Sequence, residues 1–311
     1  MEFFKHNTKI DFMAQRKGAA ILSIIIIVLS LASLMTYGLT WGLDFTGGTQ
    51  VQVSYQEPAD LTAIHDNLEK AGFDDAVIIS YGTSKDVLIS LAPKDKAEIG
   101  QNEKTQAETV KGVMAALPGA KMESVDYVGP QVGAEMASKG LLAVIIALIG
   151  TMIYIAMRFG WYFAIGSTVA LLHDPIIIVG VFSFFHIEFN LISLAAVLTV
   201  IGYSLNDTIV IFDRVRENFR KLRKADTLEV LNLSINQTLS RTIMTSALTL
   251  TVVVALFVLG GTLLYGFALA LIIGIVVGTY SSIYVAGSLA VVLGLSRHHL
   301  VPQLKEVDER P

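Results

Sequence analysis

A carboxylate and a guanidinium occur beside long apolar stretches, where charged side chains are rare. Asp207 belongs to an apolar stretch that ends near Phe212, and Arg241 stands at the start of the next one. An ionisable side chain inside a membrane span costs about 2.5–3.5 kcal/mol on insertion scales, so each one needs a reason. The polar residues on or beside the two helix faces are Thr199, Tyr203 and Asn206 near Asp207, and Thr245 and Thr249 after Arg241. The pattern predicts a water-accessible seam between two helices.

Two interpretations of Asp207 are open. In the first, Asp207 gains and loses a proton during a transport cycle, and Arg241 changes its proton affinity or replaces the proton as its partner. In the second, the two residues form a permanent ion pair between helices, or Arg241 extends to the membrane interface. The residue types alone do not decide between them.

A second carboxyl group, Asp174, lies between His173 and Pro175 in another apolar stretch. Pro175 removes a helix hydrogen-bond donor, which predicts a kink or local hydration. Asp174 is therefore either a secondary proton relay or a packing feature bonded to neighbouring hydroxyl groups. The second reading is slightly favoured, because a proline beside a carboxyl group is also typical of a hinge.

The composition indicates a membrane protein. Of the 311 residues, 53% are hydrophobic and 16% are charged, with a mean hydropathy of +0.60, whereas soluble domains carry about 25% charged residues. Six stretches are long enough to span a bilayer: 18–38, 139–157, 161–184, 191–212, 242–259 and 265–293. The last is long for one perpendicular span, so it is tilted, kinked near Gly274 and Gly278, or shorter.

The distribution of lysine and arginine predicts the orientation. Basic residues precede the first span and follow the second and fourth, whereas the short connections 185–190 and 260–264 contain none. The N-terminus (1–17), the tail (294–311) and the basic segment 213–241 are therefore predicted to be cytoplasmic. Segment 213–241 is either an amphipathic surface helix or a solvated basic loop.

Residues 39–138 form the one large extracytoplasmic segment in this topology. The pattern gives strands at 50–55, 76–80, 87–91 and 121–128, with helices at 59–71 and 101–117. The order βαββαβ is that of a ferredoxin-like α+β domain. The fold prediction is thus a multi-pass α-helical membrane protein with a periplasmic α+β domain between the first two spans.

Several kinds of chemistry are excluded or unsupported. The chain has no cysteine, and it lacks the glycine-rich and lysine signature of a nucleotide-binding loop. No metal, cofactor, nucleic acid or enzymatic activity is expected. The energy for any work must come from the membrane gradient or from a partner.

Four motifs resemble the SecD/SecF family of protein-export subunits, in the resistance–nodulation–division superfamily. They are WGLDFTGG at 41–48, VGPxxG at 128–133, GYSLNDT at 202–208 and NxSINQTLSRT at 232–242. The resemblance implies proton passage at Asp207 and Arg241 with Asn206 beside them. The motif residues Asp44, Gly47, Gly48, Gly129 and Pro130 border the domain, and the glycine pair is read as a hinge and tight turn in which Asp44 could cap the turn.

The resemblance also implies partners and a location. It implies a bacterial inner-membrane protein that forms a heterodimer with SecD and assists the SecYEG channel, with YajC as a further candidate partner. Such a complex uses the proton gradient to promote late translocation and release of unfolded preproteins on the periplasmic side. The alternatives are half of a small-molecule exporter of the same superfamily, or a scaffold subunit that conducts no protons.

Overall fold

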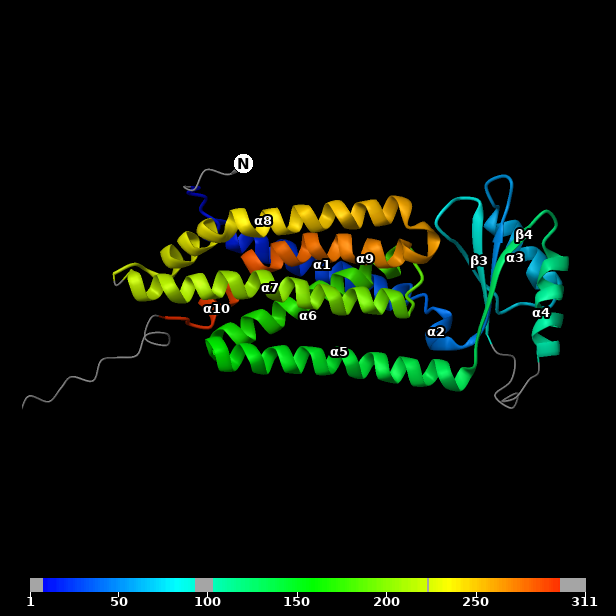
Figure 1. Ribbon diagram of the computed structural model, residues 1–311, viewed down its shortest axis with the longest axis horizontal. Helices are drawn as coiled ribbons and strands as arrows, with labels where there is room; N and C mark the ends of the chain where they lie inside the picture. The colour runs from blue at the N-terminus through cyan, green and yellow to red at the C-terminus, as the bar shows by residue number, and fades with distance from the viewer. Residues whose placement is uncertain (1–7, 93–102, 223, 297–311) are drawn as a thin grey trace, which may run out of the picture.

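The computed structural model describes residues 8–92, 103–222 and 224–296, which form a long helical bundle with a small domain at one end (Figure 1). Predictions for residues 1–7, 101–102, 223 and 297–311 lie outside the described residues. In chain order the elements are η1 (Met13–Gln15), α1 (Arg16–Thr36), α2 (Leu43–Thr46), β1 (Gly48–Ser54), α3 (Leu61–Lys70), β2 (Val77–Ser80), β3 (Asp86–Leu91), α4 (Glu103–Ala116), β4 (Lys121–Val128), α5 (Pro130–Phe159), α6 (Trp161–Phe184), α7 (Leu191–Lys221), α8 (Thr227–Leu259), α9 (Gly261–Ser281), η2 (Ser282–Ala286) and α10 (Gly287–Val292).

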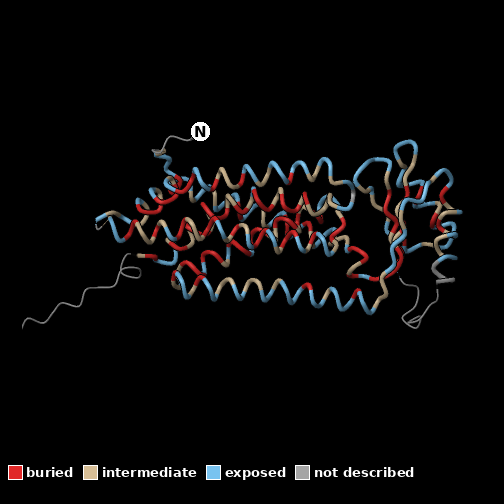
Figure 2. The backbone as a smooth tube through the Cα atoms, viewed as in Figure 1, coloured by how far each residue is buried: buried red, intermediate tan, exposed pale blue. Residues whose placement is uncertain are grey.

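Six helical segments within the described residues are long and apolar enough to cross a membrane, as predicted. They are Met13–Thr36, Pro130–Phe159, Trp161–Phe184, Leu191–Lys221, Thr227–Leu259 and Leu263–Val292. The helices α6 and α7 are the most buried, whereas α5 and α8 leave long stretches exposed (Figure 2). The chain is therefore a multi-pass α-helical membrane protein, and the exposed helix faces are apolar surfaces for lipid or a partner.

The helices α7 and α8 extend well beyond the predicted spans at the end of the bundle away from the domain. Residues 222–226 alone connect them, so segment 213–241 is neither a separate surface helix nor a loop. The reason is packing, because Leu231 and Ile235 of α8 are buried against Phe212 and Phe219 of α7. Ion pairs from Glu217 to Arg214 and Lys221 add support at i, i+3 and i, i+4 spacing.

The last span departs from regular helix later than expected. The helix α9 continues through Gly274 and Gly278, and the irregularity is the π-helical turn η2 at Ser282–Ala286. The two glycines instead permit close helix packing, since a Cβ at Gly274 would clash with Val200 Cγ2 and one at Gly278 would lie 3.1 Å from Ser204 Cβ.

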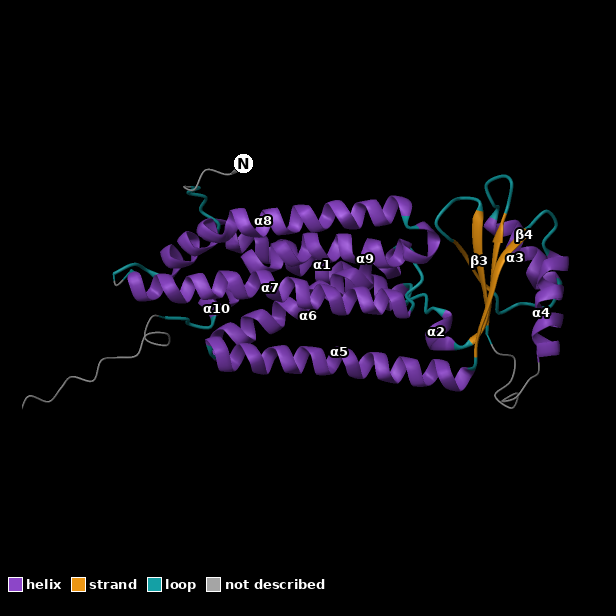
Figure 3. Cartoon of the chain, viewed as in Figure 1, coloured by secondary structure: helices purple, strands orange, loops and turns teal. Residues whose placement is uncertain are grey.

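The small domain has the predicted βαββαβ order (Figure 3). Its four antiparallel strands are arranged β2-β3-β1-β4. Alternate strand residues, such as Val51, Val53 and Ile89, form a core with Leu68 of α3 and Val113 of α4. This is the ferredoxin-like arrangement, with helices on one face of the sheet.

The domain is joined to the α6–α7 connection at its end of the bundle. Trp41 forms a β-bridge with Phe189, and Gly42 N–H donates to the Phe189 carbonyl oxygen over 2.9 Å. The Gln50 side chain on β1 donates to the Glu188 carboxyl group over 3.0 Å. These contacts therefore attach the domain directly to the connection between α6 and α7.

Candidate functional site

Asp207 is a buried carboxyl group without a hydrogen-bond partner among the described residues. It lies on α7 and is 3% exposed, and its buried Oδ2 atom accepts no hydrogen bond from them. Arg241 lies on the neighbouring helix α8 with its side chain exposed. No ion pair joins the two among the residues that the structure describes, so the permanent pair of the second interpretation is not formed in this conformation.

One turn before Asp207, a polar contact between α7 and α8 passes through Ser246, a residue that the sequence did not single out. The Tyr203 hydroxyl lies 3.5 Å from Ser246 Oγ, which in turn lies 2.9 Å from Thr279 Oγ1 on α9. Thr245 and Thr249 instead donate to carbonyl oxygens of their own helix. Ser246 is offset by one residue from the Arg241 face, which is why the helical spacing missed it.

Thr199 and Asn206 lie on the exposed side of α7, away from the buried carboxyl group of Asp207. Thr199 donates to the carbonyl oxygen of Ala195 on its own helix. The structure therefore brings Tyr203, but neither Thr199 nor Asn206, into the interhelical contact.

Asp174, unlike Asp207, has polar partners at both of its carboxyl oxygens. Its Oδ2 atom accepts hydrogen bonds from Ser204 of α7 (2.7 Å) and Ser281 of α9 (3.0 Å), and its Oδ1 atom lies 2.9 Å from His173 Nδ1. The residue is completely buried. Asp174 thus connects three helices, as the packing interpretation requires.

A second group of hydroxyls continues this network. Ser282 Oγ donates to the Ser204 carbonyl oxygen over 3.1 Å and lies 2.8 Å from Thr208 Oγ1. Ser282 is the first residue of the π-helical turn, where backbone groups leave the regular i to i−4 pattern. The irregular turn therefore coincides with the polar contact between α9 and α7.

The asparagines that precede Arg241 hold the N-terminal segment. The Asn232 side chain accepts from Met13 N–H (2.9 Å) and donates to Asp11 (2.7 Å). Asn236 binds both backbone groups of Ile10, accepting over 3.0 Å and donating over 2.8 Å. At i, i+4 spacing they lie on one face of α8, so this helix is tied to the residues that lead into α1.

The two glycine motifs that border the domain contact each other. Gly47 has a φ of 66° and Gly48 a φ of 120°, which L-residues rarely adopt. A Cβ at Gly47 would lie 2.7 Å from Pro130 Cα, and one at Gly133 would lie 2.7 Å from Gly47 N. The Asp44 carboxyl group accepts from the N–H of Leu191, the first residue of α7, over 2.8 Å. The motifs thus fix the joint between the domain, α5 and α7.

Gly47→Ala is expected to destabilise this joint by about 2–4 kcal/mol, because it combines a left-handed φ with a backbone clash. Gly129→Ala is the matched control, since Gly129 has an ordinary φ and no atom within 4 Å of its would-be Cβ. The measurement is the thermal unfolding midpoint of each purified protein. Equal midpoints for the two variants would contradict the tight contact.

Two family models match the chain. "Protein export membrane protein SecD/SecF, C-terminal" matches residues 109–296, and "SecD/SecF GG Motif" matches residues 32–59. The second model covers the glycine pair, and the first covers Asp174, Asp207 and Arg241.

Curated relatives and solved structures agree with these models. "Protein translocase subunit SecF" of Vibrio alginolyticus is 46% identical, covering 100% of this chain and 99% of the relative. The same-named protein of Pseudomonas aeruginosa is 49% identical, covering 97% and 98%. A crystal structure of SecDF, a translocon-associated membrane protein from Thermus thermophilus, matches with a TM-score of 0.84 and 35% identity, covering 94% of this chain and 39% of that longer chain. With matches over nearly its whole length, the chain belongs to the SecD/SecF family of protein-export membrane proteins.

Proposed function

We propose that this chain is a SecF-like accessory subunit of the Sec export machinery, driven by the proton gradient together with SecD. It promotes late translocation of preproteins through SecYEG, with YajC as a further candidate partner, and their release on the periplasmic side. The observation that carries the proposal is Asp207, a buried and unpartnered carboxyl group on a central helix of an export-family protein.

Proton transfer at Asp207 is coupled to helix position. A charge without a partner is costly inside a bilayer, whereas a neutral carboxyl group costs less. Loss of the proton therefore favours an arrangement in which Asp207 meets Arg241, and uptake favours the separated arrangement seen here. Because the change between the two arrangements moves α7 relative to α8, proton uptake and loss at Asp207 produce a helix displacement.

The contacts of α8 and α7 carry that displacement to the domain. Displacement of α8 acts through Asn232 and Asn236 on the N-terminal segment and then along α1. Displacement of α7 acts at its first residue, where Leu191 binds Asp44 beside the domain. A second solved structure, SecDF in a super-membrane-facing form, matches this chain with a lower TM-score of 0.67 at the same 35% identity, which supports an architecture with more than one arrangement.

The orientation follows from the charged end of the bundle. Arg158 lies in the last turn of α5, and Arg214, Arg216 and Lys221 lie near the end of α7. These two helix ends lie opposite the domain (Figure 1), and basic residues mark the cytoplasmic side. We place both termini in the cytoplasm and the domain in the periplasm, in the inner membrane of a bacterium. Asp174 is the secondary candidate for a proton relay.

The test of the export function is complementation. In a bacterial strain depleted of its own SecF subunit, this chain, expressed with the SecD of its own source, is expected to restore maturation of a secreted precursor. Restoration should be lost when the proton gradient is collapsed. Unchanged precursor maturation together with altered drug susceptibility would instead identify a small-molecule exporter.

A further inference from the structure

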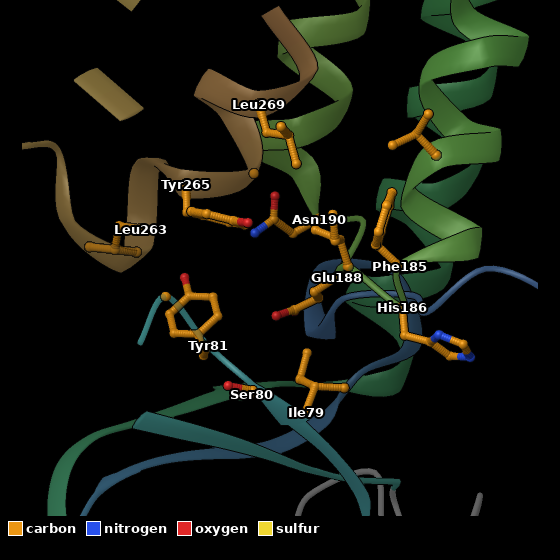
Figure 4. Close-up of a pocket in the computed structure, with 14 residues that line it drawn as sticks. Ile79, Ser80, Tyr81, Phe185, His186, Glu188, Asn190, Leu263, Tyr265 and Leu269 are labelled. Carbon is orange, nitrogen blue, oxygen red and sulfur yellow. The ribbon is translucent and has the colours of Figure 1, made fainter. Parts of the chain in front are cut away.

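A cavity of about 440 Å³ lies between the domain and the bundle (Figure 4). Its walls come from residues 79–82 at the end of β2, from the α6–α7 connection, and from the first turns of α9. The proton site does not line it, and the motif at 41–48 reaches it where the Leu43 backbone hydrogen-bonds to Glu188. Its chemistry therefore needs its own explanation.

One buried carboxyl group dominates the charge of the cavity. Glu188 is 8% exposed, and Figure 4 shows its carboxyl group directed toward the space that Tyr81 and Tyr265 border. Among the described residues that line the cavity, Glu188 is the sole acid and none is lysine or arginine. The carboxyl group accepts hydrogen bonds from Gln50 and the Leu43 backbone, which are neutral donors. Its charge therefore has no cationic counterpart among the described lining residues, and the cavity is electrostatically suited to a positively charged guest.

The aromatic lining points to the same ligand class. Tyr81, Tyr265 and Phe185 line the cavity around the carboxyl group, and aromatic faces attract ammonium and guanidinium ions. The Asn190 side chain also lines it and supplies an amide. A carboxylate flanked by aromatic rings is the combination that holds an alkylammonium or guanidinium group with apolar carbons around it.

The free edge of the sheet indicates where the cation comes from. The strand β2 is at the end of the order β2-β3-β1-β4, and no described strand pairs with its outer side. Residues 79–80 of β2 and the turn after it form one wall of the cavity. An extended chain can add to such an edge through backbone hydrogen bonds while one side chain enters a pocket. A lipid amine would use the cavity but not the edge.

We propose that this cavity binds a lysine or arginine side chain of an extended polypeptide that pairs with the outer edge of β2. The inference rests on the proposed export function, whose substrate is unfolded polypeptide. The proposal gives the domain end of this chain a binding site that selects polypeptide segments carrying a positive charge.

Cation binding at this site is expected to weaken as the pH falls. Burial raises the pKa of the Glu188 carboxyl group, while Gln50 and the Leu43 backbone lower it through hydrogen bonds and Asp44 raises it through charge repulsion. Protonation of Glu188 removes the negative charge of the cavity, so cation binding weakens as the pH falls, and a cationic segment is held near neutral pH and released on acidification.

The experiment measures peptide binding to the full-length chain in phosphatidylcholine nanodiscs. The probe is a fluorescent ten-residue peptide of alternating valine and threonine with one central lysine, compared with the same peptide carrying acetyl-lysine. We expect the lysine peptide to bind about tenfold more tightly to the wild-type protein. Glu188→Gln should remove this preference, and Tyr265→Leu should reduce it while keeping the Glu188–Gln50 contact. Glu123→Gln, which removes an exposed acid of the same domain, should leave it unchanged.

Three results would overturn the proposal: equal affinity for the two peptides, a lysine preference that survives Glu188→Gln, or loss of lysine-peptide binding when phosphatidylethanolamine replaces phosphatidylcholine. The last result would assign the cavity to a lipid headgroup. A chain that binds the lysine peptide but never responds to the gradient contradicts the proposed function alone, and a chain that responds without any lysine preference contradicts the cavity alone.

Discussion

Replacing Asp207 by asparagine is expected to reduce export to the rate measured without a proton gradient, while the chain still inserts and assembles with SecD. The substitution keeps the size and polarity of the side chain but removes its ability to ionise. Because the Asp207 side chain makes no hydrogen bond or ion pair among the described residues, and its buried Oδ2 atom has no partner, the variant loses no hydrogen bond that holds the fold. The whole effect should therefore fall on the response to the gradient.

The measurement is the release of a secreted protein from spheroplasts or inverted membranes, with and without collapse of the gradient. Asp213→Asn is the matched control on the same helix, since Asp213 is exposed and lies 3.4 Å from Arg158. That surface ion pair contributes little, so the control should respond to the gradient like the wild type. A normal gradient response in a correctly inserted Asp207→Asn protein would show that the proton path lies elsewhere in the complex.

Asp207 could be selected from the sequence because the apolar residues around it are enough to show that a charge there is costly. The same is true of the six spans and of the βαββαβ order, which follow from hydropathy and from the period of apolar residues. Each of these features is a property of a single segment. Segment-level rules therefore recovered the architecture and the principal candidate residue.

The remaining features depend on which segments meet in space. In the sequence, Asn232 and Asn236 are polar positions in a motif, whereas in the structure both hydrogen-bond to the N-terminal segment. Glu188 stands in a short connection with no unusual pattern, and its burial arises only when the domain packs on the bundle. The extension of α8 to Thr227 likewise depends on the apolar face that α7 offers it. No periodicity within one segment encodes such pairings.

Asp174 offers the second large effect, because its two interpretations predict different results for two substitutions. Asp174→Ala removes the partner of the Ser204 hydroxyl group and of His173 Nδ1 and leaves both groups buried without it, whereas Ser281 keeps the Gly278 carbonyl oxygen as an acceptor. Unsatisfied buried polar groups cost about 1–3 kcal/mol each, so the protein should lose roughly 2–4 kcal/mol of stability. Thermal unfolding of the purified protein measures the loss.

Asp174→Asn is the decisive companion, since asparagine keeps the volume and an acceptor oxygen, and serine hydroxyls can rotate to suit it. We expect this variant to keep a near-normal unfolding midpoint and a normal response of export to the gradient, because a carboxyl group with three partners on three helices serves as an anchor. If Asp174→Asn were stable but as unresponsive as Asp207→Asn, Asp174 would be a second proton relay. The two carboxyl groups would then exchange protons in series across α6 and α7, and the hydrogen bonds seen here would belong to only one step of the cycle.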